Sequence, residues 1–450
     1  MRRLLGPISA LLMCILTITS VEARDYPNVP RLVFAHYMLC CPMTATPTVE
    51  DFREEIRLAK SAGIDGFAVN IGSWTGQPVY QARGQLLYEA ARLEGDFKLF
   101  LSLDTPPVDE AVTAVKEMAD QPASLRVDGK LVVSTFGGPP EWSALLREAL
   151  TDEKIDMFYV PNSGYWGRKL ASRAQMKFWG GDPAIPNATA ALSDIPMDGY
   201  FYFGADRDFN ELATSISSIS QIMHASGKIF MAGVSPYYRG IMSNARMFDG
   251  RGFEGMQKQW MAAIESKSDW VEIVTWNDWN ESTYIAETPN WKYPDSFSEK
   301  PLLLDHSGFR KASEYYIKWF KTGAPPPITQ DRVIYFYVPH MNSALGVISP
   351  KTGERGRPRR SETLEDKIYF TAFLTAPITL TVRIGETTSE LSLPAGVTNV
   401  SVPKETGDVD VDIRREGAEL TKAELPFPVT DDGAFANFNY QTGELNLTAP

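Results

Sequence analysis

Apolar runs of strand length alternate with stretches of helical spacing along the first two-thirds of the chain. A representative unit begins with an apolar run at Leu32 and continues with Phe52, Ile56 and Ala59 on one helical face, before Gly63. The alternation predicts strands over residues 32–39, 64–71, 97–103, 130–136, 155–160, 199–203, 229–234 and 271–275, and helices over 48–62, 77–93, 108–119, 141–150, 168–177, 209–225, 255–266 and 309–321.

These eight strand–helix units predict an α/β fold class, with a (β/α)8 TIM barrel over residues 24–321. A doubly wound open sheet is the alternative, because it is built from the same units. The sequence has no Gly-x-Gly-x-x-Gly at the first unit and no phosphate-binding loop after a predicted strand, which disfavours nucleotide binding. In a barrel, the residues that follow the strands collect at one mouth, where active sites lie.

A different pattern begins after three consecutive prolines at positions 325–327. Residues 322–330 are predicted to be a stiff linker, because prolines cannot continue the preceding helix. Short β-branched runs punctuated by Gly, Pro and Asn then predict an all-β sandwich over residues 331–450. Its predicted strands cover residues 333–338, 367–374, 378–384, 387–393, 398–402 and 409–413, and its predicted exposed loop covers 351–361.

The first 23 residues have the pattern of a secretion signal. Arg2 and Arg3 precede an apolar run over residues 8–18 that is too short to span a bilayer, and a small-x-small site ends at Ala23. The chain is therefore predicted to be secreted, with cell-wall association as a further option, and an uncleaved anchor is the alternative. No other segment is apolar enough to cross a membrane, so no membrane partner is expected after cleavage.

The net charge of −12 argues against nucleic acid or an anionic membrane as a partner, whereas a neutral polymer would not be repelled. The acidity also has a simpler interpretation, which is solubility. Ten Trp, 18 Tyr and 23 Phe are enough for both a core and a carbohydrate-facing cleft. The sequence leaves the oligomeric state open.

Cysteine and histidine usage disfavours a disulfide framework and a metal site. Of three cysteines, Cys14 belongs to the predicted signal, and Cys40 and Cys41 are adjacent. Neighbouring Cα atoms lie about 3.8 Å apart, below the usual disulfide range of about 4.4–6.8 Å, so two free thiols and a strained ring are both open. The four histidines have no ligand spacing, and neither a metal nor a cofactor is predicted.

Two carboxylates follow the last predicted strand of the barrel. Asp278 and Glu281 lie within Trp-Asn-Asp-Trp-Asn-Glu-Ser, between indoles and amides. Burying carboxylates beside aromatic rings costs solvation, so a pair in this position favours function over stability. Hydrolysis of a glycosidic bond needs such a pair, one as the acid for the leaving oxygen and one as the base for water. The alternative is that Asp278 occupies a turn and Glu281 caps a short helix.

Further polar and aromatic residues follow the other predicted strands and form the expected binding surface. Amides offer a donor and an acceptor to sugar hydroxyls, and aromatic faces stack on sugar rings. Each also has a structural interpretation, as a core histidine, a carboxylate that caps a helix or turn, or a packed ring. The candidates are His36, Tyr37, Asn70, Asp104, Asp206, Tyr237, Trp276 and Asn277.

Four segments together resemble glycoside hydrolase family 71, the secreted α-1,3-glucanases or mutanases. They are Phe-Ala-His-Tyr-Met at 34–38, Gly-Ile-Asp-Gly-Phe-Ala-Val-Asn at 63–70, Leu-Ser-Leu-Asp at 101–104, and Trp-Asn-Asp-Trp-Asn-Glu-Ser at 276–282. The likeness extends over nearly the whole mature chain, including Tyr-Phe-Tyr at 335–337. The adjacent Cys40 and Cys41 depart from it.

The resemblance implies a barrel with an attached sandwich, and endo-hydrolysis of α-1,3-glucan with inversion at the anomeric carbon. It implies no metal and no organic cofactor, and it places the catalytic carboxylates on Asp278 and Glu281. We assign Glu281 as the acid and Asp278 as the base. The alternatives are a glycosidase of other linkage specificity and a non-catalytic carbohydrate-binding wall protein.

Overall fold

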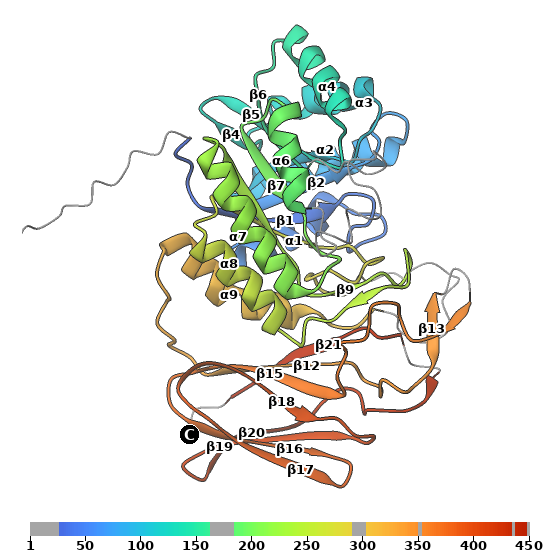
Figure 1. The fold of residues 1–450 in the computed structure, drawn as a ribbon, viewed down its shortest axis with the longest axis vertical. Helices are drawn as coiled ribbons and strands as arrows, with labels where there is room; N and C mark the ends of the chain where they lie inside the picture. The colour runs from blue at the N-terminus through green and yellow to red at the C-terminus, as the bar shows by residue number, and fades with distance from the viewer. Residues whose placement is uncertain (1–26, 163–183, 290–302, 350–352, 434–436, 448–450) are drawn as a thin grey trace, which may run out of the picture.

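The computed structural model describes residues 27–162, 184–289, 303–349, 353–433 and 437–447. The N-terminal part, as far as Thr322, is a curled sheet covered by helices (Figure 1). The C-terminal β region, residues 332–447, forms separate antiparallel sheets beneath it. The predicted signal over 1–23 and the predicted helix over 168–177 lie outside the described residues.

Eight parallel strands and one short antiparallel strand make up the curled sheet. They are β1 (Leu32–Met38), β2 (Gly66–Ile71), β3 (Lys98–Leu103), β4 (Arg126–Val127), β5 (Lys130–Phe136), β6 (Met157–Asn162), β7 (Gly199–Tyr202), β8 (Ile229–Val234) and β11 (Trp270–Ile273). The order is β4-β5-β3-β2-β1-β11-β8-β7, with β6 also paired to β5. The first and last parallel strands, β1 and β11, are therefore neighbours.

The expected closed ring is interrupted between β6 and β7. Within the described residues no ladder joins these two strands. Instead Asp198, just before β7, donates its backbone N–H to Tyr159 O at 2.9 Å and accepts the Tyr159 N–H on its carboxylate at 2.9 Å. The observed architecture is thus a curled α/β sheet, and one backbone and one side-chain hydrogen bond link β6 to the start of β7 in place of a ladder.

Of the described helices that cover the sheet, all but the unpredicted helix over Ala184–Asp194 lie close to predicted positions. The described helices are α1 (Val49–Ser61), α2 (Pro78–Glu94), α3 (Val108–Ala119), α4 (Pro140–Asp152), α6 (Ala184–Asp194), α7 (Phe209–Ala225), α8 (Glu254–Glu265) and α9 (Ser307–Thr322). Local chemistry explains the ends: Thr48 and Asp51 form a capping box that starts α1, and Gly323 takes the left-handed conformation that ends α9.

Strand alternation divides the apolar residues between two cores. Phe34 of β1 faces the inside of the curl, where its ring meets Phe100 at 4.9 Å and Trp270 at 5.6 Å. Its neighbours Val33 and Ala35 face the helices instead. Residues adjacent in a strand therefore face opposite sides of the sheet.

Two four-stranded antiparallel sheets make up most of the C-terminal β region. One has the order β18 (Gly396–Pro403), β15 (Lys367–Leu374), β12 (Arg332–Tyr337) and β21 (Gln441–Leu445). The other has the order β17 (Thr387–Leu393), β16 (Ile378–Ile384), β19 (Val409–Arg415) and β20 (Ala418–Glu424). Val333 and Phe370 of the first sheet share an apolar core with Leu380 and Val411 of the second.

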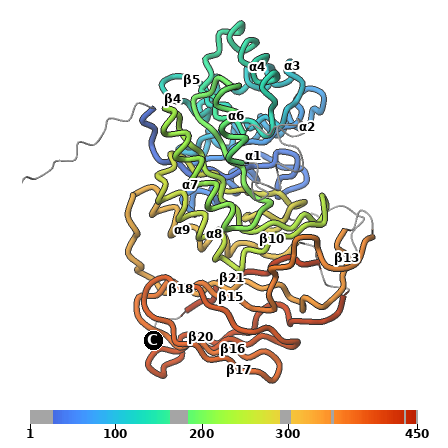
Figure 2. Tube along the Cα trace, in the orientation of Figure 1, coloured from blue at the N-terminus to red at the C-terminus, as the bar shows by residue number. Residues whose placement is uncertain are grey.

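The first of these sheets also packs against the helices of the N-terminal part, above it in Figure 2. Phe336 of β12 meets Phe309 of α9 at 4.9 Å between ring centroids, and both belong to the same apolar cluster as the outer face of the curled sheet. The C-terminal β region therefore shares a hydrophobic core with the N-terminal part.

Two small hairpins lie where these parts meet: β9 (Tyr238–Arg239) with β10 (Met247–Phe248), and β13 (Gly346–Ser349) with β14 (Glu354–Gly356). The prediction of an exposed loop over 351–361 is wrong in two places. Glu354–Gly356 forms β14, and Ser361 is buried, with its hydroxyl donating to Pro358 O at 2.7 Å.

Candidate active site

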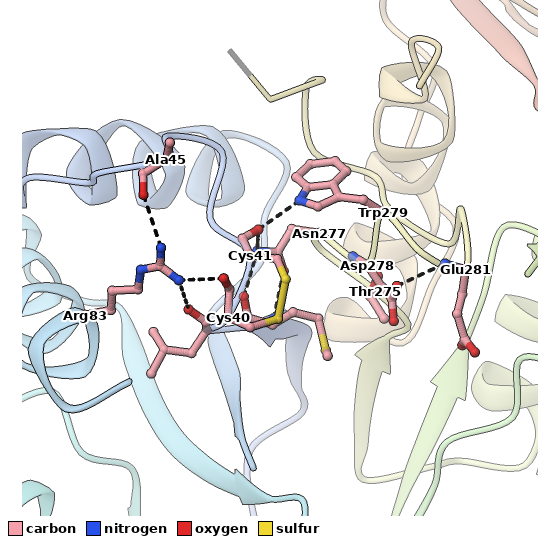
Figure 3. Close-up of a disulfide and its surroundings, with 11 residues drawn as sticks. Cys40, Cys41, Ala45, Arg83, Thr275, Asn277, Asp278, Trp279 and Glu281 are labelled. Atoms are coloured by element: carbon pink, nitrogen blue, oxygen red, sulfur yellow. Dashed lines mark hydrogen bonds between the residues drawn. A yellow bond between two sulfur atoms is a disulfide. The ribbon is translucent and has the colours of Figure 1, made fainter. Parts of the chain in front are cut away.

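The loop that follows β11 is held by its own polar side chains. Thr275 Oγ1 accepts the backbone N–H of Asp278 at 2.8 Å, and the Asp278 carboxylate accepts the backbone N–H of Glu281 at 3.0 Å. The backbone N–H of Trp276 donates to His36 O at 2.7 Å, which joins the loop to the end of β1. Figure 3 shows Asp278 and Glu281 on this loop, both partly exposed.

Burial and neighbouring charge make Glu281 a weak acid. Burial raises its pKa to about 8, and the negative charges of Asp278 and Asp206 add to the effect. Two neighbours oppose it: Tyr238 donates its hydroxyl to Glu281 Oε1 at 2.7 Å, and Arg246 brings a positive charge. At neutral pH the Glu281 carboxyl therefore carries a proton.

Burial also raises the pKa of Asp278 above its ordinary value. The hydrogen bond from the Glu281 N–H and the proximity of His36 lower it in turn. The two carboxyls thus titrate in one another's field, with Glu281 held protonated and Asp278 supplied with a donor that favours its charged form.

Four further predicted residues lie at or just past the ends of parallel strands, and two of them, His36 and Asp206, act on the charges of this pair. His36 is 1% exposed, and its Nδ1 contacts Glu272 Oε1 at 2.6 Å inside the curl. Asn70 is buried near the end of β2, and Asp104 is exposed just past β3. Asp206 follows β7 and pairs with Arg207 and Arg246, each at 2.9 Å.

Tyr37 and Trp276 face away from the mouth, contrary to expectation. Because Tyr37 is next to the inward-facing His36, strand alternation turns it towards α1, where its hydroxyl donates to Glu55 at 3.1 Å. The Trp276 ring is fully buried on the same side, and its N–H donates to the other oxygen of Glu55 at 2.8 Å. Neither ring is available to stack on a sugar.

Tyr237 also faces away from the mouth, contrary to expectation. Its ring is buried against α9 and the C-terminal β region, 4.9 Å from the Tyr440 ring, and its hydroxyl donates to Asn439. The next residue, Tyr238, faces Glu281 instead. The residue predicted from the sequence is therefore the neighbour of the tyrosine that contacts Glu281.

Asn277 has a structural role beside the catalytic candidates. Its side chain is fully buried, accepts the Met38 N–H at 2.7 Å and donates to Cys41 O at 2.8 Å (Figure 3). Trp279 donates its indole N–H to the same Cys41 oxygen at 2.9 Å. Cys40 and Cys41 form a disulfide, which settles the choice left open by the sequence. The hydrogen bonds from Asn277 and Trp279 to Cys41 O attach the loop after β1 to the loop that carries Asp278.

The structure adds residues that sequence reasoning missed. Glu272 is a carboxylate in the middle of an apolar strand, and that position is the signal that could have identified it. Phe136 and Phe203 are partly exposed aromatics near His36, with ring centroids 4.8 Å apart, whereas Trp276 and Trp279 are buried. A sugar-stacking role therefore suits the phenylalanines better than the indoles.

No group of three or more His, Cys, Asp or Glu in the described part of the chain could hold a metal ion. Of the helices within the described ranges, none has the length and apolar character needed to span a bilayer.

Comparison with known proteins gives three curated relatives. The chain is 27% identical over 447 residues to a glucan endo-1,3-α-glucosidase of Schizosaccharomyces pombe, covering 93% of this chain and 95% of that protein. It is 28% identical over 429 residues to a mutanase of Penicillium rubens, covering 92% and 88%. It is 26% identical over 429 residues to an ascus wall endo-1,3-α-glucanase of S. pombe, covering 87% and 88%.

Among solved structures, a GH99 endo-α-mannosidase from Bacteroides thetaiotaomicron superposes with a TM-score of 0.49 at 16% identity, over 66% of this chain and 99% of that one. The sequence model of glycosyl hydrolase family 71 matches residues 29–449, which includes the curled sheet, the Asp278–Glu281 loop and the C-terminal β region. The chain therefore belongs to glycosyl hydrolase family 71 and is a glycoside hydrolase.

Proposed function

We propose that the protein is a secreted, endo-acting hydrolase of α-1,3-glucan that inverts the anomeric carbon. Three relatives that match over most of their length are named for α-1,3-glucan hydrolysis or as a mutanase, which supports this substrate. The single observation that carries the mechanism is the pair of carboxyls on one loop, of which Glu281 has a pKa of about 8 and Asp278 receives the Glu281 N–H.

In the proposed mechanism, Glu281 acts as the general acid and Asp278 as the general base. Glu281 gives its proton to the glycosidic oxygen as the bond to the anomeric carbon breaks. Asp278 takes a proton from a water that attacks the opposite face of the sugar. Inversion requires about 6.5–9.5 Å between the two carboxyls, which leaves room for that water.

The substrate is proposed to lie across the mouth of the curled sheet. His36, Asn70 and Asp104 are the proposed hydrogen-bonding partners of sugar hydroxyls, because each lies at or just past the end of a parallel strand. Asp206 is proposed to keep Glu281 protonated by its charge. The Phe136 and Phe203 rings supply apolar faces for stacking.

The layout of the chain is proposed to follow the family pattern. A signal over residues 1–23 directs secretion, and the wall location named for one relative suggests an extracellular or wall-associated protein. Residues 24–321 are proposed to form a (β/α)8 catalytic barrel, 322–330 a linker, and 331–450 a β-sandwich.

The test is hydrolysis of purified polysaccharides followed by NMR of the fresh products. We expect new reducing ends from insoluble α-1,3-glucan and none from starch or β-glucans, with β-anomers appearing first because inversion of an α-bond releases them. Activity only on another polymer would contradict the substrate, and α-anomers appearing first would contradict inversion. Binding to glucan without reducing ends at any pH would favour the non-catalytic alternative.

Leaving-group chemistry separates the two carboxyl roles. An aryl glycoside with an acidic phenol needs little protonation, so Glu281→Gln should lose much less activity on it than on glucan, while Asp278→Asn should lose activity on both. The reverse pattern would exchange the roles of acid and base.

A further inference from the structure

The hairpin β9–β10 contains an arginine whose charge is fully buried. Arg239 is 0% exposed, and its guanidinium donates to Ile348 O at 2.8 Å and Asn437 O at 3.0 Å. Both acceptors are backbone carbonyls of the C-terminal β region, 109 and 198 residues away in sequence. Among the described residues, no carboxylate forms an ion pair with it.

The same hairpin is bonded to the loop that carries the candidate acid. The Arg239 backbone N–H donates to Glu281 O at 2.9 Å, and the Met242 N–H donates to Asn280 O at 3.2 Å. On its other side, Arg359 exchanges backbone hydrogen bonds with Ala245 and Met247. The hairpin therefore connects the Glu281 loop with the C-terminal β region.

Tyr238, the residue before Arg239, makes this connection relevant to chemistry. Its hydroxyl donates to Glu281 Oε1 at 2.7 Å and accepts from Asn244 Nδ2 of the same hairpin at 2.6 Å. Any displacement of the two-residue strand β9 moves this hydroxyl relative to the carboxyl. A change of a few tenths of an ångström in such a bond alters the acidity of the carboxyl.

Arginine suits the anchoring position for a physical reason. Its rigid fork can serve two carbonyls at once, while a lysine ammonium is a single point on a flexible stem. Burial without a counter-charge is costly, and it lowers the pKa of Arg239 to about 10. A fold that retains a buried cation at this point fixes the position of β9 with more precision than an apolar side chain would.

We propose that Arg239 is a positioning residue through which the C-terminal β region holds Tyr238 against Glu281. The inference rests on the proposed role of Glu281 and extends it, because it makes the C-terminal β region part of the support of the active site. In this view the region is required for correct geometry at the acid even if it binds no glucan.

The charged and titratable groups around Glu281 define what a displacement would change. Asp278 lies on its own loop, Asp206 follows β7, and Arg246 and Tyr238 belong to the hairpin or its connection. The hydrogen bond from Tyr238 lowers the pKa of Glu281, so loss of that bond must raise it further. The alkaline limb of the rate profile then moves to higher pH.

The experiment compares pH profiles of kcat and kcat/KM for Tyr238→Phe, Arg239→Lys and the double variant, normalised to the folded fraction. Tyr238→Phe should move the alkaline limb upward. Arg239→Lys should move it in the same direction and lower kcat about tenfold with little change in KM, consistent with a weakened hydrogen bond to a charged group. The double variant should show no further shift, because both changes act on one bond.

Arg310→Lys is the matched control. Arg310 is also buried and donates to a backbone carbonyl, Ile285 O, at 2.8 Å; it also pairs with Glu287 at 3.7 Å, and neither partner belongs to the hairpin. It should lower thermal stability and leave the alkaline limb in place. Arg239→Gln, which keeps one donor, serves as the second variant if Arg239→Lys does not fold.

An Arg239 variant that loses stability like Arg310→Lys, with an unmoved limb, would overturn the proposal and leave Arg239 with a structural role only. Additive shifts in the double variant would also overturn it. If Tyr238→Phe itself leaves the limb in place and Glu281→Gln stays active, the proposed function of Glu281 has failed, and this inference fails for that separate reason.

Discussion

Three buried or partly buried glutamates show how one chemical group takes different roles. Glu55 accepts from Tyr37, Trp276 and the Met43 N–H, so its pKa, raised to about 7 by burial, is limited by three donors. Glu272 Oε1 contacts Nδ1 of the His36 ring at 2.6 Å. Glu281 accepts a hydrogen bond from the Tyr238 hydroxyl and lies near the carboxylates of Asp278 and Asp206, which suits a proton donor.

Replacing Glu281 by Gln should stabilise the protein at alkaline pH. The folded-state pKa of about 8 exceeds the ordinary 4.5, so the folded state binds the proton more tightly and loses stability as pH rises from 4.5 to 8. Gln is neutral throughout. In urea unfolding we compare the free energy of unfolding of Glu281→Gln with that of the native protein. We expect the difference to move in favour of the variant by about 1–3 kcal/mol between pH 4.5 and pH 8. An equal difference at both pH values would contradict the raised pKa.

At the scale of the element, the Asp278 loop is coupled to the disulfide-bearing loop after β1. Asn277 and Trp279 donate to Cys41 O, and on the far side Arg83 donates to Cys40 O and Ala45 O (Figure 3). The loop carbonyls are thus fixed from both sides. The disulfide bridges the two residues that carry these carbonyls: Arg83 holds Cys40 O, and Asn277 and Trp279 hold Cys41 O.

Reduction of this disulfide should therefore lower turnover. Cys40 and Cys41 form a disulfide, and the one other cysteine of the chain, Cys14, lies in the predicted signal, so a dithiol reductant has a defined target. We expect kcat on glucan to fall several-fold on reduction, because Asn277 loses its fixed acceptor beside Asp278. The Cys40→Ser/Cys41→Ser variant is the control: its kcat should equal that of the reduced protein and should not change when the reductant is added. Full activity after verified reduction would show that the loop needs no covalent restraint.

Elements were easier to predict than the direction of their side chains. Val108–Ala119 and Phe209–Ala225 have the predicted bounds, because apolar spacing and caps are local signals. Tyr237 and Tyr238 illustrate the limit: both are aromatic and adjacent, and only the path of the chain after β8 decides which one meets Glu281. The small hairpins and β21 were missed because two to five residues carry too little pattern. Two longer elements, α6 and β20, were missed as well.

For the whole molecule, the contact between its two parts contains a buried histidine that is neutral in the fold. His306 is fully buried, contacts Tyr284 O and Asn439 Oδ1, each at 3.0 Å, and stacks on the Tyr284 ring at 3.9 Å. Burial lowers its pKa to about 4. Charging His306 requires a proton in an environment with little solvent, so acid must weaken this contact.

Stability should accordingly fall as the pH is lowered from about 6.5 to 4. The pKa of His306 is lower in the folded than in the unfolded state, so on acidification the unfolded chain takes up this proton at a higher pH. The stability that is present above pH 6.5 is therefore lost as the pH falls. This one group accounts for up to about 3 kcal/mol. In urea titrations, His306→Gln should be destabilised at pH 7, and its deficit should narrow by that amount at pH 4. If the difference in free energy of unfolding between His306→Gln and the native protein is the same at pH 7 and pH 4, His306 does not contribute to the pH dependence of stability.

The central claim is that Asp278 and Glu281 cleave the substrate, and it is tested most directly by the initial rate of Asp278→Asn and Glu281→Gln on insoluble α-1,3-glucan. Asp104→Asn, an exposed carboxylate at the same mouth, is the matched control. With folding verified by circular dichroism, we predict that each of the two variants loses about 100-fold or more of the native rate and that Asp104→Asn loses much less. Near-native rates in both Asp278→Asn and Glu281→Gln would contradict the account.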